Sequence, residues 1–168
     1  YKIRPAPDEL PGRWLNGAQS YETLAGVNAA LEYLQSVGQD HKEYNSYFPH
    51  LTGRRQEMKA GMQAIRDYET ILTRKLLNAI QLLPQYTVWG AKDEAHDPWR
   101  VPTIAVSRDG VKSNDMALYL ADNRVNIWSR SVYSISLSER LGLENTGGFI
   151  RVGIVHYNTA EEIDRLLQ

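Results

Sequence analysis

The amino-acid sequence predicts an α/β protein, an α+β sandwich in which a small mixed sheet is covered by helices. Apolar residues repeat with helical spacing in the first half of the chain, whereas most short β-rich runs lie after Gln85. The order of elements is helix, helix, strand, strand, helix, strand, helix, strand, helix, which is typical of a sheet layered against helices. We therefore expect an extended arm over residues 1–19, a helical connecting segment over 20–83 and a small α/β domain over 84–168.

An N-terminal arm precedes the first helix. Three of the seven prolines lie in this arm together with the turn signal Pro11-Gly12, which prevents regular structure there. Ser20 is a good N-cap, and the apolar residues after it lie at three- and four-residue steps: Leu24, Val27, Leu31 and Leu34. We expect a helix over residues 20–37 that is ended by Gly38.

The longest helix follows a segment without a lasting period. Residues 39–53 fit either a short helix or an aromatic loop. Residues 54–83 then carry one continuous apolar stripe, formed by Met58, Met62, Ile65, Tyr68, Leu72, Leu76 and Ile80. Pro84 cannot continue a helix, so we expect this helix to end there.

The second half of the chain alternates strands and helices. Its composition predicts four strands, over residues 86–89, 103–106, 125–128 and 149–155, of which the last is the most convincing. Short helices are expected over residues 113–120, with Ser113 as the N-cap, and over 136–143. A final helix starts at Thr159, because Thr159 and Glu162 have the spacing of a capping box.

The charge balance and the absence of cysteine exclude several functions. The chain has 19 Lys and Arg against 20 Asp and Glu, so no basic excess is left for phosphates, and we expect neither a nucleic-acid binder nor a membrane-surface protein. Without cysteine the chain has no disulfide, thiolate metal site or thiol nucleophile. No apolar stretch approaches the roughly 20 residues that span a bilayer, and no signal peptide is recognised, so we expect a cytoplasmic protein.

Standard metal and phosphate motifs are also missing from the sequence. None of the four histidines has a second histidine or a carboxylate at a helical ligand spacing on a predicted helix; they are His41, His50, His96 and His156. The sequence contains no serine-nucleophile elbow, Walker loop or dinucleotide-binding glycine motif. We therefore expect no metal site in this chain.

Arg151 stands between Ile150 and Val152 in the strand that we expect to be central. On a period of two, its side chain points to the face opposite these two apolar residues, where its guanidinium can bind a carboxylate through two parallel hydrogen bonds. That carboxylate belongs either to a substrate or to a structural salt bridge on the exposed side of the sheet. The residues alone leave both interpretations open.

Four segments of the chain carry a family resemblance. The most specific is the C-terminal stretch 148–167, with the motif Arg151-Val-Gly-Ile-Val-His-Tyr-Asn-Thr159. The others, which match in the same order along the chain, are residues 11–22, 24–34 and 127–143. Together they closely resemble the C-terminal portion of class V aminotransferase-fold enzymes that depend on pyridoxal phosphate, in particular the cysteine desulfurase-like branch.

This resemblance implies a fold, a cofactor and a role for Arg151. It implies the C-terminal small domain of a fold type I enzyme, in which Arg151 grips the α-carboxylate of an amino-acid substrate while Trp128 and Tyr133 line the pocket. In that family the lysine that forms a Schiff base with pyridoxal phosphate lies upstream of this chain, so no catalytic residue is expected within it. We expect Lys42 to be an exposed loop residue instead.

The chain departs from the family pattern at the phosphate contact. The Gly17 turn matches a Glu-x-Gly-Thr motif whose threonine reaches the cofactor phosphate of the partner subunit in a homodimer. Here the sequence is Leu15-Asn16-Gly17-Ala18, and Ala18 has no hydroxyl. The resemblance therefore leaves Gly17, Ala18 and Gln19 to contact the phosphate through backbone N–H groups or the Gln19 side chain.

A second departure concerns the persulfide-forming cysteine of true desulfurases. The loop that holds it in the family reads Ser131-Val-Tyr-Ser134 here, and Trp128-Ser129-Arg130 replaces the Trp-Asp-Gly of the branch. Because no other side chain accepts sulfur as a thiolate does, a thiolate relay within this chain is disfavoured.

Two functions are compatible with these features. The first is a homodimeric enzyme acting on an amino acid or related amine, with its N-terminal large domain in the same polypeptide; transamination, β-elimination, desulfuration by another route and epimerisation all stay open. The isolated chain would then be inactive. The alternative is a noncatalytic degenerate homologue serving as an interaction or structural module. This alternative is supported by the departures from the family pattern at Leu15, Asn16, Ala18 and Ser129.

Overall fold

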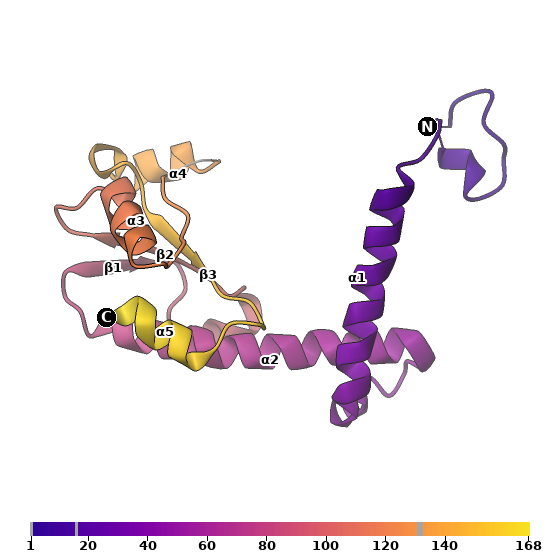
Figure 1. Cartoon of the computed structure of the whole chain (residues 1–168), viewed down its shortest axis with the longest axis horizontal. Helices are drawn as coiled ribbons and strands as arrows, with labels where there is room; N and C mark the ends of the chain where they lie inside the picture. The colour runs from indigo at the N-terminus through magenta and orange to yellow at the C-terminus, as the bar shows by residue number, and fades with distance from the viewer. Residues whose placement is uncertain (1, 16, 131–132) are drawn as a thin grey trace. The chain divides into compact units, whose positions relative to one another are not determined.

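The computed structural model describes residues 2–15, 17–130 and 133–168 (Figure 1). Asn16, Ser131 and Val132, on which some of the expectations above fall, lie outside the described residues. The chain divides into two compact units, residues 1–64 and 65–168, and the boundary between them falls inside the longest helix. The division expected after residues 19 and 83 stays a prediction.

The first unit contains helix α1 (Tyr21–Asp40) and the start of helix α2 (Gly53–Gln81). Ser20 caps α1 as expected, since its Oγ accepts a hydrogen bond from the backbone N–H of Thr23 at 3.4 Å. Two short 3-10 helices flank α1, η1 (Gly12–Trp14) and η2 (Lys42–Tyr47). The second of these decides the open question about residues 39–53 in favour of a short helix.

Gly38 does not end α1, so this expectation is wrong. The helix passes through Gly38, because this glycine lies where α1 and α2 approach closely. A Cβ atom on Gly38 would lie 1.8 Å from the backbone oxygen of Glu57, and one on Gly61 would lie 2.4 Å from that of Leu34. The amides of Gln35 and Gln39 add hydrogen bonds to the Glu57 carboxylate, at 2.6 and 3.1 Å. The glycine therefore serves helix packing.

The second unit is built on a three-stranded sheet with the order β1-β2-β3. The strands are β1 (Tyr86–Trp89), β2 (Thr103–Arg108) and β3 (Ile150–Gly153), and both pairings are antiparallel. The α/β class is confirmed, whereas the expected mixed sheet is antiparallel throughout, because each pair of neighbouring strands runs in opposite directions. β2 is the central strand and β3 lies at the edge, so the expectation that Arg151 lies in the central strand is wrong.

One face of the sheet is covered by the C-terminal half of α2, by α3 (Ser113–Asp122) and by α5 (Ala160–Leu167). Figure 1 shows α5 lying along the C-terminal half of α2. The buried side chains of this core are Leu72, Leu76, Leu77, Ile80, Ile104, Val106, Met116, Ile150, Val152, Ile154 and Ile163. Those that belong to the strands, Ile104 and Val106 of β2 and Ile150 and Val152 of β3, occupy every second position, as alternation on a half-covered sheet requires.

Residues 125–128 do not form the expected strand. The backbone N–H of Val125 donates to Leu120 at 2.8 Å, which draws the start of this segment into the turn that ends α3. Only Trp128 pairs with β3, through an isolated antiparallel bridge to Arg151. The segment has the composition of a strand, but the backbone hydrogen bond from Val125 to the end of α3 prevents it from forming one.

Ser113 begins α3 but does not cap it. Its side chain is buried and donates a hydrogen bond to the backbone oxygen of Gly147 at 2.8 Å, while the N-cap position is occupied by Lys112. The remaining helices are α4 (Ile135–Arg140), η3 (Glu94–Trp99) and η4 (Glu144–Thr146). None of the helices in the described part of the chain is long and apolar enough to cross a membrane.

The capping box of α5 is confirmed. Thr159 Oγ1 accepts from the backbone N–H of Glu162 at 3.3 Å, and the Glu162 carboxylate accepts from the N–H of Thr159 at 2.9 Å. The Asn158 amide also donates to Glu162 at 3.0 Å. These hydrogen bonds, that from Asn158 first, lower the pKa of Glu162 below its ordinary value.

We expect the substitution Gly38→Ala to lower the free energy of unfolding by about 3 kcal/mol, because the new methyl group must displace backbone of α2. Gly26→Ala, also within α1 but with nothing within 4 Å of its new Cβ, is the matched control and should stabilise by about 0.5 to 1 kcal/mol. Urea unfolding followed by far-ultraviolet circular dichroism measures both. Equal stabilities of the two variants would contradict the packing role of Gly38.

The stability of α5 should depend on pH with a definite sign. Because the folded-state pKa of Glu162 lies below its unfolded value, its contribution is present above the ordinary glutamate pKa of about 4.3 and is lost as pH falls through the folded pKa. Glu161, whose pKa is also lowered, adds to the same effect. Amide hydrogen exchange in α5 should show this loss, and the double variant E161Q/E162Q should not, since glutamine keeps the capping box without the charge.

Candidate functional site

Arg151 lies in β3 on the face of the sheet that the helices leave open. Its neighbours Ile150 and Val152 are buried in the core, whereas Arg151 itself is half-buried, which confirms the predicted alternation. Within the described residues, no carboxylate lies at salt-bridge distance from its guanidinium, and no side chain or backbone oxygen accepts a hydrogen bond from it. The sequence allows Arg151 to be either a substrate ligand or part of a structural salt bridge. The described residues supply no partner for the salt bridge.

Trp128 lies beside Arg151 in the structure. The two residues exchange backbone hydrogen bonds, at 2.7 Å from Arg151 N and 3.3 Å from Trp128 N. The Arg151 guanidinium carbon lies 6.0 Å from the centre of the Trp128 ring, at the outer limit of a cation–π contact. The indole is 54% exposed, so it forms an open wall next to the guanidinium.

Tyr133 is not brought to Arg151 in this structure. Its side chain is 94% exposed, and no hydrogen bond or ring contact joins it to Arg151 or Trp128 among the described residues. Arg130, where the branch has glycine, adopts a φ of 76°, a left-handed conformation that favours glycine. The backbone here therefore keeps the conformation that a glycine motif requires, although the residue has changed.

Gly17, Ala18 and Gln19 lie immediately before the N-cap of α1. Gly17 and Ala18 are exposed, and the Gln19 amide donates back to the Gly17 carbonyl at 3.2 Å. Ser20 is engaged in the cap and in a 2.8 Å contact with the Thr23 hydroxyl. Among the described residues no hydrogen bond engages the backbone N–H groups of Gly17, Ala18 and Gln19, so all three are available as donors.

The lysines of this chain do not fit a covalent cofactor site. Four of the six lysines are exposed, namely Lys42, Lys59, Lys92 and Lys112, and Lys42 begins η2. Lys2 forms an ion pair with Asp8. The half-buried Lys75 is engaged, since its Nζ donates to Asp164 at 2.7 Å and to the Ala160 carbonyl at 3.0 Å. The described residues therefore fit a carboxylate contact at Arg151 and a peripheral phosphate contact at Gly17 and Ala18, and they do not fit the attachment point of pyridoxal phosphate.

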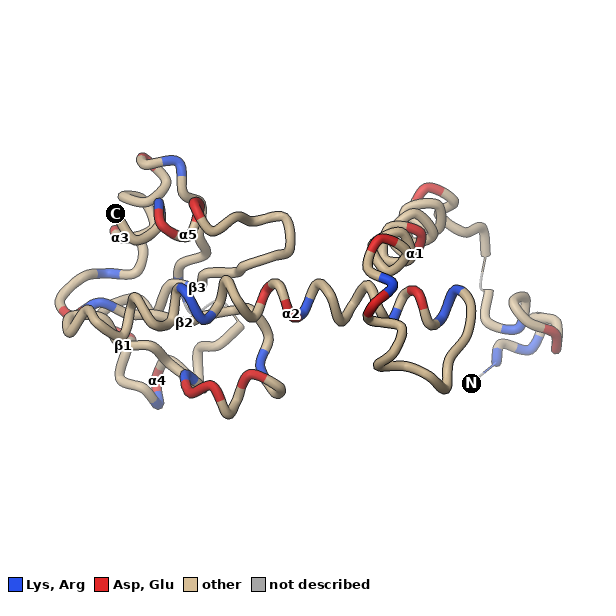
Figure 2. Tube along the Cα trace, turned by 90° about the horizontal axis from the view of Figure 1, so that it is seen from below, with Lys and Arg blue, Asp and Glu red and all other residues tan. Residues whose placement is uncertain are grey.

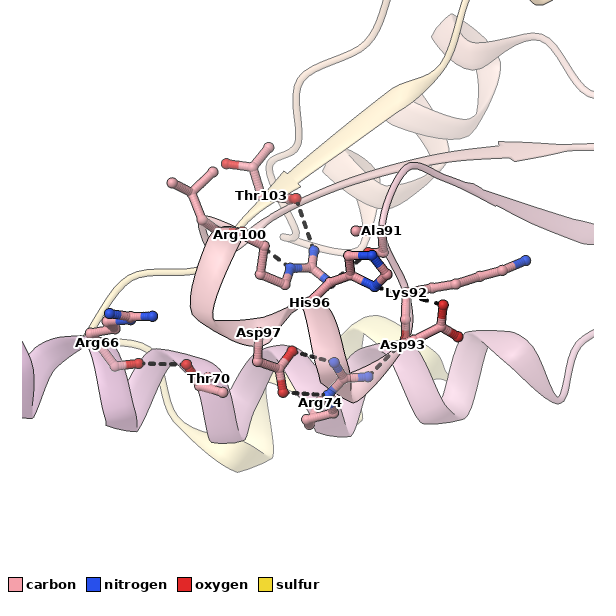
Figure 3. Close-up of polar contacts among 11 residues, drawn as sticks. Arg66, Thr70, Arg74, Ala91, Lys92, Asp93, His96, Asp97, Arg100 and Thr103 are labelled. Carbon is pink, nitrogen blue, oxygen red and sulfur yellow. Dashed lines mark hydrogen bonds and ion pairs between the residues drawn. The ribbon is translucent and has the colours of Figure 1, made fainter.

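The densest polar cluster of the second unit lies where η3 meets α2 (Figure 3). Arg74 makes a two-pronged contact with the Asp97 carboxylate, with Nε 2.9 Å from Oδ2, and its Nη1 donates to the Lys92 carbonyl at 2.8 Å. The hydrogen bond to Asp97 raises the pKa of Arg74. Arg74 and Asp97 are 14% and 20% exposed, so this ion pair is largely withdrawn from water and anchors the loop on the helix.

Arg100 binds the same loop through backbone oxygens. It donates to Ala91 at 3.1 Å and to Thr103 at 3.2 Å. Burial lowers the pKa of Arg100, and the positive charge of Arg74 acts in the same direction. Basic and acidic residues are interspersed along the sequence of α2 (Figure 2). We assign the cluster a structural role, because its charges are satisfied within the loop.

Three of the four histidines each lie near one carboxylate, and the fourth, His50, is exposed. His156 lies 3.6 Å from Glu69, His41 lies 3.2 Å from Glu43, and His96 lies 3.8 Å from Asp93. In the part of the chain that the structure describes, no group of three or more potential ligands is close enough to hold a metal ion.

Sequence reasoning missed one residue on the open face. Trp89 ends β1 with its ring on the same side as Arg151, because Val88 beside it packs toward the core. Alternation within β1 was a usable signal, but only the pairing of the strands shows that Trp89 and Arg151 belong to one row.

Comparison with known proteins gives a consistent result. A family model described as aminotransferase class-V matches residues 55–166. Over 162 residues the chain is 26% identical to an uncharacterized protein of Mycobacterium tuberculosis. This match covers 94% of this chain and 36% of that protein. Over 111 residues the chain is 30% identical to the aminotransferase-like protein FGM3 of Gibberella zeae. This second match covers 65% of this chain and 27% of that protein. The chain thus spans about a third of the length of these relatives.

A solved structure shows the same fold. The apo structure of a cysteine desulfurase from Thermococcus onnurineus superposes with a TM-score of 0.58 at 19% sequence identity, over 68% of this chain and 27% of that one. At this identity the likeness concerns the fold of the matched region.

We expect Asp97→Asn to lower the free energy of unfolding of the second unit by about 3 kcal/mol, the lower end of the range for buried ion pairs, because Arg74 loses its anionic partner. Asp93→Asn in the same loop is the matched control, since its carboxylate is 74% exposed. Chemical unfolding monitored by tryptophan fluorescence compares the two. A loss in D93N as large as that in D97N would remove the special role of the Arg74 pair.

Proposed function

We propose a function from one premise: the chain belongs to the class V aminotransferase family and resembles its cysteine desulfurase-like branch. In this proposal the chain is the C-terminal part of a pyridoxal-phosphate-dependent enzyme that acts on an amino acid or a related amine. Arg151 binds the substrate carboxylate, and Trp128 lines the pocket beside it. Tyr133 joins the pocket when substrate is bound.

One observation carries the proposal. Arg151 is a half-buried guanidinium without a carboxylate partner among the described residues, on a sheet face that the helices of its unit leave open. A guanidinium withdrawn from water gains most from an anion that accepts two hydrogen bonds in its plane, and a carboxylate has this geometry. The α-carboxylate of an amino acid therefore supplies the missing partner.

The role of this chain in the reaction is to bind and orient. Pyridoxal phosphate, when bound in the longer enzyme, supplies the electron sink for bond cleavage at the substrate α-carbon. Arg151 fixes the carboxylate, so the remaining bonds at the α-carbon point in defined directions. The N–H groups of Gly17 and Ala18 contact the cofactor phosphate of a partner subunit in a homodimer, and the attachment lysine belongs to the N-terminal large domain of the same polypeptide.

Two absences in the sequence narrow the chemistry. The chain contains no cysteine, so persulfide transfer through a thiolate of this chain does not operate. It contains no lysine suited to hold the cofactor, so we expect the 168-residue chain alone to be inactive. Transamination, β-elimination and epimerisation are the remaining classes, together with desulfuration by another route.

We expect Arg151→Ala in the longer, cofactor-loaded protein to weaken binding of an amino-acid substrate by about 2 to 5 kcal/mol, because the carboxylate is left without its partner. Arg151→Lys keeps the charge but loses the two-pronged geometry, so it should recover only part of the affinity. Arg124→Ala, which removes an exposed arginine from the turn after α3 of the same unit, is the matched control. Unchanged affinity in R151A would remove Arg151 from the site.

The visible absorption spectrum of the same protein, before and after borohydride reduction, distinguishes an enzyme from a noncatalytic homologue. A reducible cofactor band supports the enzyme. A folded protein without such a band would favour the interaction or structural module. The missing hydroxyl at Ala18 would then help to explain why the cofactor is not bound.

A further inference from the structure

A continuous row of side chains crosses the open face of the sheet. In the pairing register Trp128 lies opposite Arg151, Arg151 opposite Ala105, and Ala105 opposite Trp89. Residues directly opposite each other in a sheet project on the same side. The side-chain order on this face is therefore indole, guanidinium, methyl, indole.

Burial of the flanking residues confirms which side the row faces. Ile104, Val106, Ile150 and Val152 are buried in the core, and Val88 and Ile127 pack against it. The row residues alternate with these six along the chain, so they face away from α2, α3 and α5. Arg151, Ala105 and Trp89 are each half-buried, which leaves part of their surface for a ligand.

The Trp89 ring is held in place by its own sheet. Its indole Nε1 donates to the Ser107 hydroxyl at 2.9 Å, and Ser107 lies on the neighbouring strand β2, two residues beyond Ala105. The polar edge of the indole is thereby satisfied, so the apolar remainder of the ring needs no further polar partner. A fixed aromatic ring loses little conformational entropy when a ligand packs on it.

Ala105 provides the space between the cation and the ring. Neighbouring strands lie about 4.8 Å apart, so Trp89 stands about 10 Å from Arg151 across the sheet, with only a methyl group between them. A molecule whose carboxylate lies on Arg151 can extend its side chain over Ala105 toward Trp89. Trp128 closes the opposite side of the guanidinium.

We propose that Trp89 is a specificity-determining residue, which selects substrates with an aromatic or large apolar side chain. This inference rests on the proposed function of Arg151 as the carboxylate ligand and names the substrate class of that site. The carboxylate binds Arg151, and the side chain packs over Ala105 against the Trp89 ring.

The row also disfavours acidic substrates. Arg151 is the one cation among its four residues, and the hydroxyl nearest to Trp89, that of Ser107, is already bonded to the indole. A second carboxylate placed over Ala105 would lose its hydration without gaining a cation. An apolar side chain in the same place carries no charge whose hydration would be lost.

The test compares two carboxylates that differ only by a ring, 3-phenylpropionate and propionate, titrated into the 168-residue chain. Dissociation constants come from two-dimensional NMR, in which the indole N–H signals of Trp89 and Trp128 report the site. We expect 3-phenylpropionate to bind about tenfold more tightly or better, a difference of about 1.4 kcal/mol. We also expect it to shift the Trp89 signal, and propionate to shift mainly that of Trp128.

Variants separate the two proposals. Trp89→Leu should remove most of the tenfold preference, measured as the ratio of the two dissociation constants, whereas Trp89→Phe should keep most of it. Trp99→Leu, which removes an exposed indole from η3, is the matched control and should change neither constant. Arg151→Gln should abolish binding of both carboxylates.

Each outcome has a defined meaning. No preference for the ring in the unaltered chain, or a full preference in W89L, would overturn the role of Trp89 and leave the proposed function intact. Propionate binding that persists in R151Q would overturn the proposed function itself. Failure of both carboxylates to bind the chain at millimolar concentrations would overturn both.

Discussion

The burial of one helix face against one sheet face is the constraint on which the second unit depends. Leu72, Leu76, Leu77 and Ile80 of α2 are almost inaccessible to solvent, and they cover the side of the sheet to which Ile104 points. Burying an aliphatic side chain of this size contributes about 1.5 to 3 kcal/mol, so the four leucine and isoleucine side chains of α2 together contribute more than any single polar contact. Because a strand alternates with a period of two, this burial also decides which residues face outward. Arg151 is exposed to a ligand because its neighbours are held inside.

The same helix anchors the loops around the sheet through polar contacts. Arg74 binds Asp97 in η3, and the Tyr68 hydroxyl donates to the backbone oxygen of Asn158 at 2.8 Å. Lys75 holds the first turn of α5 through Ala160. The segments before β2 and after β3 are thus tied to one rigid element. A site built on β3 inherits that rigidity, which is what orientation of a substrate carboxylate requires.

Local signals in the sequence predicted elements well where a single segment decides the outcome. The Ser20 cap and the capping box at Thr159 depend on residues three positions apart, and both are confirmed. Predictions failed where a distant segment competes. The local sequence predicts a helix end at Gly38, but this glycine lies inside α1 where α2 packs against it. The local sequence also predicts Ser113 as a cap, but its hydroxyl donates to the backbone oxygen of Gly147, 34 residues away in the sequence. Such competition is visible only when the two segments are placed together.

The candidate site divides in the same way. The sequence by itself determined that Arg151 lies on the face opposite Ile150 and Val152, because strand alternation is a local property, and its motif identified the family. The tertiary structure alone decided the edge position of β3, the bridge that places Trp128 beside Arg151, and the register that aligns Ala105 and Trp89 with them. The physical reason is that strand pairing joins residues far apart in the chain through backbone hydrogen bonds. Since these bonds are the same for every side chain, the sequence specifies which faces are apolar but leaves the order across the sheet to packing.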